Sequence, residues 1–284
     1  MKFIIGFLVV VSCVIGGYIW HHGNLAVLWQ PSEFLIIIGA AVGAFIIGTP
    51  APLIKAILKS MKCLFKGMPH KKPSYVDLLT MQYSVYKTIR SKGMLEMEQH
   101  INNPHSSSLF TRYPTFSANH HAVDFFADYL RLMTMGVDNH YELEDLMEKE
   151  VASHRSEAQH ISHSLATMAD GMPALGIVAA VLGVIITMGS INEPPEILGK
   201  LIGAALVGTF LGVLLSYGFV GPIARYIGDV MESHVRYLEC IKAGLVAYSK
   251  GVAPAIAVEY ARTSIDVLYK PSFAEVENAC NGAG

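Results

Sequence analysis

The chain has 284 residues, and only 15% of them are charged, against about 25% in ordinary soluble proteins. Apolar residue types make up 52% of the chain, its mean hydropathy is +0.41 and its formal net charge is −2. This composition argues against a simple soluble fold, and the lack of a basic excess argues against nucleic-acid binding. The four cysteines are far apart and form no CxxC pair, so they indicate free thiols rather than disulfides or a zinc site.

Charged residues are absent from four separate blocks of the sequence. As a helix, each block would extend over roughly 25–32 Å, close to the hydrocarbon thickness of a bilayer of about 30 Å. We therefore predict an all-α integral membrane protein with four transmembrane helices, at Phe3–Trp20, Phe34–Pro50, Gly171–Ser190 and Leu201–Gly221. The first block also has the form of a signal peptide, but its apolar run continues to Trp20, which favours an uncleaved span.

Basic residues near the ends of the spans set the predicted orientation. Six lysines follow the second block before the first acid, Asp77, whereas residues 21–33 contain no Lys or Arg. By the positive-inside rule, the segment after the second block is cytoplasmic. We predict spans 1 and 2 within residues 1–50, a cytoplasmic helical domain at 51–169, spans 3 and 4 within 170–221, and cytoplasmic C-terminal helices at 222–284, with both termini inside.

The cytoplasmic segments are expected to be helical. Ser74 followed by Asp77 has the pattern of a helix N-cap, and Gly93 can end the helix that they begin. Further helices are expected over 94–101, over 120–135 before Gly136, from 139 toward the third span, and over 223–248 and 255–268.

The predicted spans contain hydroxyl groups but no carboxylate. The hydroxyls include those of Thr187, Thr209, Ser216 and Tyr217. An ionisable side chain inside a membrane usually marks an ion pathway. If this protein moves ions, the titrating carboxylate is therefore expected to come from a partner protein.

Small residues and prolines mark the same spans. Two GxxxG motifs, Gly39 with Gly43 and Gly208 with Gly212, allow close helix approach, either between chains or within one chain. A proline near the end of a span, such as Pro173 or Pro222, is equally consistent with a hinge and with simple punctuation of the helix.

No motif of an enzyme is present. The sequence contains no phosphate-binding loop, GxSxG or HExxH pattern, and the histidines at 154, 160 and 163 are better explained as a solvated helix face than as a metal cluster. We expect no enzymatic activity, no cofactor and no bound metal.

Two stretches in the third and fourth blocks carry a family resemblance. Met172–Ala180, and Val207–Gly212 running on through Tyr217–Phe219 to Pro222, resemble the corresponding spans of MotA, the larger stator subunit of the bacterial flagellar motor. Further matches cover nearly the whole chain: Gly16–Tyr18, Gln30–Pro31, Pro254, Ile256–Glu259 and Pro271–Phe273.

The resemblance implies a function and partners. It implies a multi-pass protein of the bacterial inner membrane that forms a pentamer around the single spans of a MotB-type dimer. The MotB aspartate would carry the proton and supply the carboxylate that the spans lack, and the partner would anchor the complex to peptidoglycan. The cytoplasmic domain would push on the rotor protein FliG, converting ion flow into torque for motility.

The resemblance also implies roles for single residues. Arg90 and Glu98 match the charged torque residues, and Pro173 and Pro222 match the prolines that couple ion flow to movement. Ala180, Thr209 and Tyr217 are expected on the ion path or against the partner helix. Sodium-driven relatives place a threonine where this chain has Ala180, so the resemblance favours protons over sodium as the coupling ion.

Two alternatives to a stator subunit stay open at this point. An ExbB- or TolQ-type subunit also uses protons, but such subunits energise outer-membrane processes and generally have three spans, whereas this sequence has four charge-free blocks. A non-conducting membrane scaffold would keep the four spans and give Ala180 and Thr209 no role in a pore.

Overall fold

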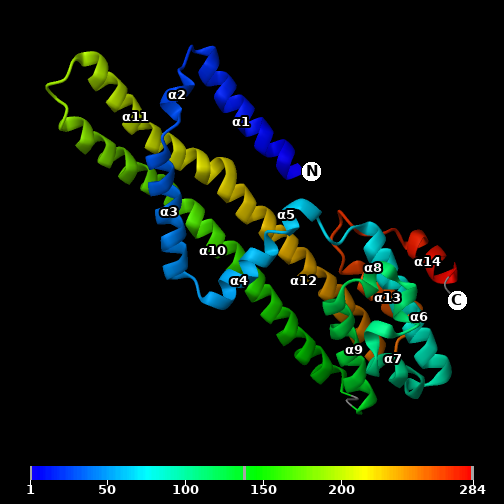
Figure 1. Cartoon of the computed structure of the whole chain (residues 1–284). Coiled ribbons are helices and arrows are strands. Elements are labelled where there is room, and N and C mark those ends of the chain that lie inside the picture. The colour runs from blue at the N-terminus through cyan, green and yellow to red at the C-terminus, as the bar shows by residue number, and fades with distance from the viewer. Residues whose placement is uncertain (1, 137–138, 283–284) are drawn as a thin grey trace. The chain divides into compact units, whose positions relative to one another are not determined.

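The computed structural model describes residues 2–136 and 139–282, and over these ranges it is helical, without a β-strand (Figure 1). Four helical runs are long and apolar enough to cross a membrane: Lys2–Trp20, Leu25–Gly48, His140–Met188 and Pro195–Ser249. The predicted all-α class with four membrane helices and a large helical insertion is confirmed. The chain divides into two compact units, which we call the membrane unit (Met1–Gly67 with Glu157–Val230) and the charged unit (Met68–Ser156 with Met231–Gly284).

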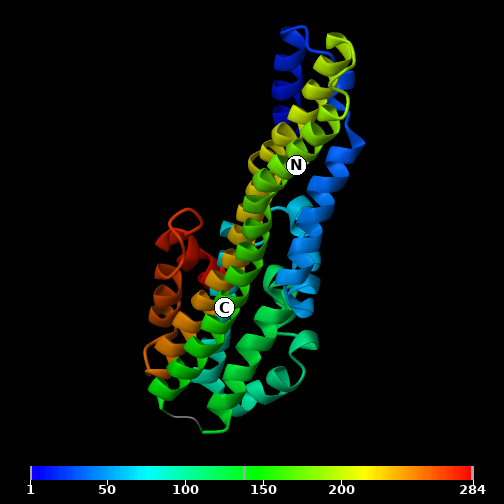
Figure 2. The ribbon, with the colours of Figure 1, turned by 90° about the vertical axis from the view of Figure 1, so that its left-hand side faces the viewer.

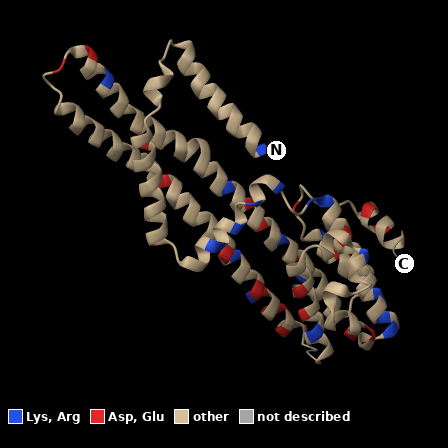
Figure 3. Ribbon diagram, in the orientation of Figure 1, with Lys and Arg blue, Asp and Glu red and all other residues tan. Residues whose placement is uncertain are grey.

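The membrane unit contains the apolar helices. Its elements are α1 (Lys2–Trp20), α2 (Leu25–Leu28), α3 (Pro31–Gly48), α4 (Ala51–Ser60), α5 (Cys63–Lys66), the C-terminal part of α10 (His140–Met188), α11 (Pro195–Val213), a π-helical segment (Leu214–Val220) and the start of α12 (Gly221–Ser249). Lys, Arg, Asp and Glu are sparse along α1, α3 and α11 (Figure 3). Helix α1 buries none of its residues, which is stable for an apolar helix in lipid but not in water.

A small apolar core joins α3, α10 and α11. It consists of Ile37, Ala41, Met172, Ala179, Val207 and Leu211. Helices α10 and α11 lie side by side (Figure 2), and their backbones touch through glycines. A Cβ atom on Gly212 would lie 2.7 Å from the Met172 carbonyl oxygen and 2.8 Å from the Gly176 Cα, so this contact requires glycine.

The two GxxxG motifs therefore differ in whether they are packed within the chain. Gly208 and Gly212 pack within the chain, against α10. A Cβ on Gly43 would meet no atom within 4 Å, and one on Gly39 only its own helix neighbour Leu35 at 4.0 Å. The Gly39 and Gly43 face of α3 is therefore open in this chain.

The observed helix ends differ from the predicted span ends. The third span is part of a continuous helix, α10, so Pro173 lies in a helix interior rather than near a start. The fourth span continues through the π-helical segment directly into α12, so Pro222 does not end the helical run. The second span's helix begins at Pro31, three residues earlier than its charge-free block, and so includes Glu33.

The charged unit is built on α6. Its elements are α6 (Lys72–Lys92), α7 (Glu98–Asn102), α8 (Pro114–Ser117), α9 (His120–Thr134), the start of α10, most of α12, α13 (Pro254–Thr263) and α14 (Phe273–Gly282), with 3₁₀ turns at Met94–Met97, Pro104–Ser106 and Phe110–Arg112. The α6 residues Leu78, Leu79 and Val85 are fully buried. The buried Gln82 amide donates to the Ile241 carbonyl at 3.3 Å, and Tyr86 stacks on Tyr248 with ring centroids 4.5 Å apart.

Local signals in this unit were partly misread from the sequence. Ser74 does not cap α6, which begins at Lys72, and its hydroxyl donates to the Lys71 carbonyl instead. Asp77 caps a different helix, because its carboxylate accepts from the backbone N–H of Thr115 at 2.8 Å and of Phe116 at 3.1 Å. Helix α14 was not predicted. Gly93 ends α6 with a φ of 86°, and Gly136 follows α9 with a φ of 90°, as expected.

Candidate functional site

Two exposed charges stand on either side of the turn that follows α6. Arg90 lies in the last turn of α6, and Glu98 is the first residue of α7. Between them, Gly93 takes a φ of 86° and Lys92 pairs with Glu96 at 3.4 Å. Neither Arg90 nor Glu98 forms an ion pair or a side-chain hydrogen bond with any residue that the structure describes. Both charges are therefore available to a partner.

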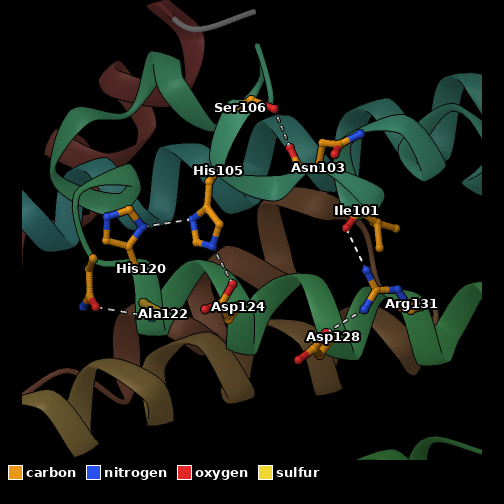
Figure 4. A network of polar contacts seen from close by, with 10 residues as sticks. Ile101, Asn103, His105, Ser106, His120, Ala122, Asp124, Asp128 and Arg131 are labelled. Atoms are coloured by element: carbon orange, nitrogen blue, oxygen red, sulfur yellow. Dashed lines mark hydrogen bonds and ion pairs between the residues drawn. The ribbon is translucent and has the colours of Figure 1, made fainter.

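The segment that carries Glu98 is anchored by buried side chains and by α9. Met97 and Ile101 flank the exposed Glu98 and are almost fully buried. The Arg131 guanidinium of α9 donates to the Ile101 carbonyl at 3.0 Å and pairs with Asp128 at 2.8 Å (Figure 4). A cation at the C-terminal carbonyls of a short helix stabilises that helix, so α7 is positioned by α9.

A second polar contact joins the 3₁₀ turn after α7 to α9. The His105 Nε2 lies 2.8 Å from an Asp124 carboxylate oxygen, and its Nδ1 lies 3.0 Å from the Nδ1 of His120 (Figure 4). The sequence indicated neither contact, because the partners are 15 to 30 residues apart and no motif connects them. Over the described residues, no group of three or more His, Cys, Asp or Glu could hold a metal ion.

A buried histidine pair lies in the core of the charged unit. The His70 Nε2 and the His234 Nδ1 are 3.0 Å apart, and the His70 ring stacks on Tyr237 with centroids 4.0 Å apart. Burial, together with the smaller effect of the neighbouring His234, lowers the pKa of His70 to about 3. Burial likewise lowers the pKa of His234. Both rings are neutral at physiological pH, and one N–H donates to the other ring.

The membrane unit places the two predicted coupling prolines in continuous helices. Pro173 has no N–H to donate to the carbonyl four residues before it, Ala169, and it follows Met172, whose carbonyl oxygen touches Gly212. Pro222 lies in the first turn of α12, directly after the π-helical segment, where the Gly221 N–H donates to the carbonyl five residues back, that of Ser216. The wider π turn makes room for a residue that has no backbone N–H to donate. Such turns are frequent at functional sites.

The structure packs Gly208 of α11, the neighbour of Thr209, against Ala180 of α10, and it places Tyr217 on the π-helical segment. A Cβ on Gly208 would lie 3.0 Å from both the Ala179 Cβ and the Ala180 nitrogen. Thr209 is half-buried there. Tyr217 is 68% exposed on the π-helical segment, where a partner helix could reach it.

The structure also adds a residue that sequence reasoning excluded. Glu33 is 7% exposed in the first turn of α3, and a Cβ on Gly208 would lie 2.6 Å from its Oε2. Glu33 therefore lies in the helix of the second span, one residue before the charge-free block that begins at Phe34. The preceding Pro31, a residue favoured at helix starts, could have shown that the helix begins before Glu33.

Sequence comparison covers most of the chain. The signature of the Motility protein A N-terminal family matches residues 4–93, and that of the MotA/TolQ/ExbB proton channel family matches residues 117–240. The chain is 42% identical to Motility protein A of Escherichia coli strain K12, over 98% of this chain and 94% of the relative. The chain belongs to the motility protein A family.

Two further comparisons agree with this membership. The chain is 37% identical to the chemotaxis protein LafT of Vibrio parahaemolyticus, over 98% of this chain and 97% of that protein. The fold matches the flagellar MotAB stator complex from Bacillus subtilis with a TM-score of 0.76 at 23% identity, over 97% of this chain and 98% of that one. A C. jejuni MotAB structure matches with a TM-score of 0.78 at 19% identity, over 94% and 96%.

Proposed function

We propose that the chain is a stator subunit of the flagellar motor, which forms a proton channel with a MotB-type partner and converts ion flow into torque. The observation that carries this proposal is the full-length membership of the motility protein A family, with an N-terminal signature specific to that family. That signature, together with the four membrane-capable helices, favours a stator over an ExbB- or TolQ-type energiser.

The partners follow from the solved relatives and from the geometry. Relatives are solved as MotAB stator complexes, so a MotB-type single-span subunit carrying the proton-accepting aspartate is the partner that we propose. The unpaired Arg90 and Glu98 would contact charged residues of the rotor protein FliG. Exposed ion pairs are each worth only about 0–1 kcal/mol, which suits repeated brief contact. We further propose a pentamer in the bacterial inner membrane with both termini in the cytoplasm.

The proposed mechanism couples protonation to helix movement. One charge crossing the membrane is worth about 2.3 kcal/mol per 100 mV, enough to drive a small conformational step. Protonation of the partner aspartate would change its contact with α10 and α11 near Ala180 and Thr209. Pro173 and Pro222 lie within or next to these helices at points where a backbone hydrogen bond is missing, so bending is easiest there. The cytoplasmic helices would then advance the rotor.

The test is complementation of a non-motile strain that lacks its own stator genes. The chain is expressed with its MotB-type partner, and swimming is scored while the proton and sodium gradients are collapsed separately. We expect swimming that stops when the proton gradient is lost and continues without sodium. Failure to swim despite normal membrane levels of both proteins would contradict the stator role, and loss of swimming on sodium removal alone would contradict proton coupling.

A further inference from the structure

Glu33 is a buried carboxylate for which the chain offers no partner. It lies in the first turn of α3, and its Oε2 has no hydrogen-bond partner among the residues that the structure describes. An ionised carboxylate costs several kcal/mol to bury without donors. Such a cost is usually tolerated only where a site uses the group.

A capping role does not explain the position of Glu33. Three residues before it, Gln30 occupies the N-cap of α3, where a capping box would join the Glu33 carboxylate to the Gln30 backbone N–H. That N–H donates to the Leu28 carbonyl at 3.2 Å instead. The Glu33 side chain is turned toward α11.

Helices α10 and α11 both approach this carboxylate of α3. Oε2 occupies the space beside Gly208 that a Cβ atom would fill, and the same space is 3.0 Å from the Ala180 nitrogen. Thr209 follows Gly208 directly. The groups around Glu33 are therefore small or apolar, Gly208 from α11 with Ala179 and Ala180 from α10, and no Lys, Arg or His of the described chain forms an ion pair with it.

We propose that Glu33 is a proton-binding group of the ion path, supplied by this chain at the level of Ala180 and Thr209. This inference rests on the proposed function as a proton channel. The Glu33 carboxylate takes a proton from a hydronium ion that enters the path, forming an O–H bond and leaving a water molecule, and is neutral while buried. It then releases that proton to the aspartate carboxylate of the partner span and regains its charge, so that no proton is gained or lost by the chain over one passage.

The chain offers a matched control for this role. Glu196 also stands in the first turn of a membrane helix, α11, but it is exposed. Glu33→Gln keeps the size of the side chain and mimics the neutral acid, so the fold should tolerate it. Glu33→Asp keeps the acid but shortens its reach, and Glu196→Gln removes an acid from an equivalent exposed position.

The experiment uses the full complex with its MotB-type partner in proteoliposomes. The first readout is infrared difference spectroscopy over a pH series, because a protonated carboxylic acid has its own carbonyl band. We expect this band in the wild type and in Glu196→Gln, and a smaller band in Glu33→Gln, where only the partner aspartate still contributes to it. The second readout is proton flux against pH, measured with an entrapped pH dye. Glu33→Gln should reduce flux several-fold and flatten its pH profile, whereas Glu33→Asp should retain a profile with a displaced midpoint.

The outcomes separate the two proposals. A wild-type complex that conducts no protons would overturn the proposed function itself. A wild-type complex that conducts, with Glu33→Gln unchanged in flux, in pH profile and in the carboxylic acid band, would overturn the role of Glu33 alone. Reduced flux with an unchanged pH profile and an unchanged band would show that Glu33 acts only in packing, and would also overturn it.

Discussion

The glycine contact between α10 and α11 predicts that substitutions in the two GxxxG motifs change the free energy of unfolding by different amounts. Gly212→Val would place a side chain where backbone already lies, at 2.7 Å from the Met172 oxygen and 2.8 Å from the Gly176 Cα. Because both obstacles are backbone atoms, they can move only if the helices separate. Gly43→Val is the matched control, since a Cβ there meets nothing within 4 Å.

The magnitude follows from packing and from helix propensity. Overpacking a tight contact costs about 1–3 kcal/mol. Replacing a helical glycine by valine recovers a few tenths of a kcal/mol through propensity. We therefore expect Gly212→Val to lower the free energy of unfolding by about 2 kcal/mol, and Gly43→Val to leave it unchanged within about 0.5 kcal/mol.

Thermal unfolding of the detergent-solubilised chain, expressed without its partner, measures both variants. The expected result is a melting temperature several degrees lower for Gly212→Val and unchanged for Gly43→Val. Equal melting temperatures for the two variants would refute the close packing of α10 on α11. A Gly43→Val variant that is stable alone but fails to assemble with its partner would identify the open face of α3 as a contact between chains.

Three further predictions concern the charged unit and the prolines. Because burial lowers the pKa of His70 to about 3, below the unfolded value near 6.5, its stabilising effect is complete above about pH 6.5 and is lost as the pH falls. Acidification from pH 7 to 5.5 should lower the free energy of unfolding by about 1 kcal/mol through His70. A His70→Phe variant should lose that part of the pH dependence. If the variant keeps the pH dependence of the wild type, the His70 ring is not neutral and buried. Reversal of either exposed charge, Arg90→Glu or Glu98→Lys, should abolish or slow swimming while membrane abundance stays at the wild-type level and the free energy of unfolding stays within about 0.5 kcal/mol of the wild type. Wild-type torque in tethered cells would remove these residues from the rotor contact. Pro222→Ala restores an N–H that can donate to the Gly218 carbonyl, so it should leave the melting temperature equal or higher but uncouple proton flux from rotation, whereas intact rotation would show that this proline has no coupling role.

The spans and the fold class could be predicted because burial in lipid imposes a simple, local rule. A run of about 20 residues without charge is readable in one dimension, and α1 follows the prediction almost to the residue. The same rule could not show that Glu33 is buried, because burial depends on which groups shield the acid. These groups come from α10 and α11, which lie far along the chain.

The remaining failures have the same origin in long-range contacts. The role of Asp77 depends on Thr115, which is 38 residues away, so the local capping pattern with Ser74 was misleading. Gly208 and Gly39 are equivalent in sequence, and only the presence of Gly176 opposite one of them assigns its role. Arg90 and Glu98 could be proposed from the family resemblance, but nothing in the sequence showed that Arg131 holds the Glu98 segment.

The interleaving of the two units has a consequence for biosynthesis. Each unit consists of two stretches separated by a stretch of the other, so neither can be completed until late in translation. The buried amide of Gln82 receives its carbonyl partner, Ile241, 159 residues later. At typical elongation rates this interval is roughly 10–30 s. During that time the part of α6 that packs against α13 and α14 lacks its partners, so we expect the nascent protein to need a chaperone or rapid membrane insertion to avoid aggregation.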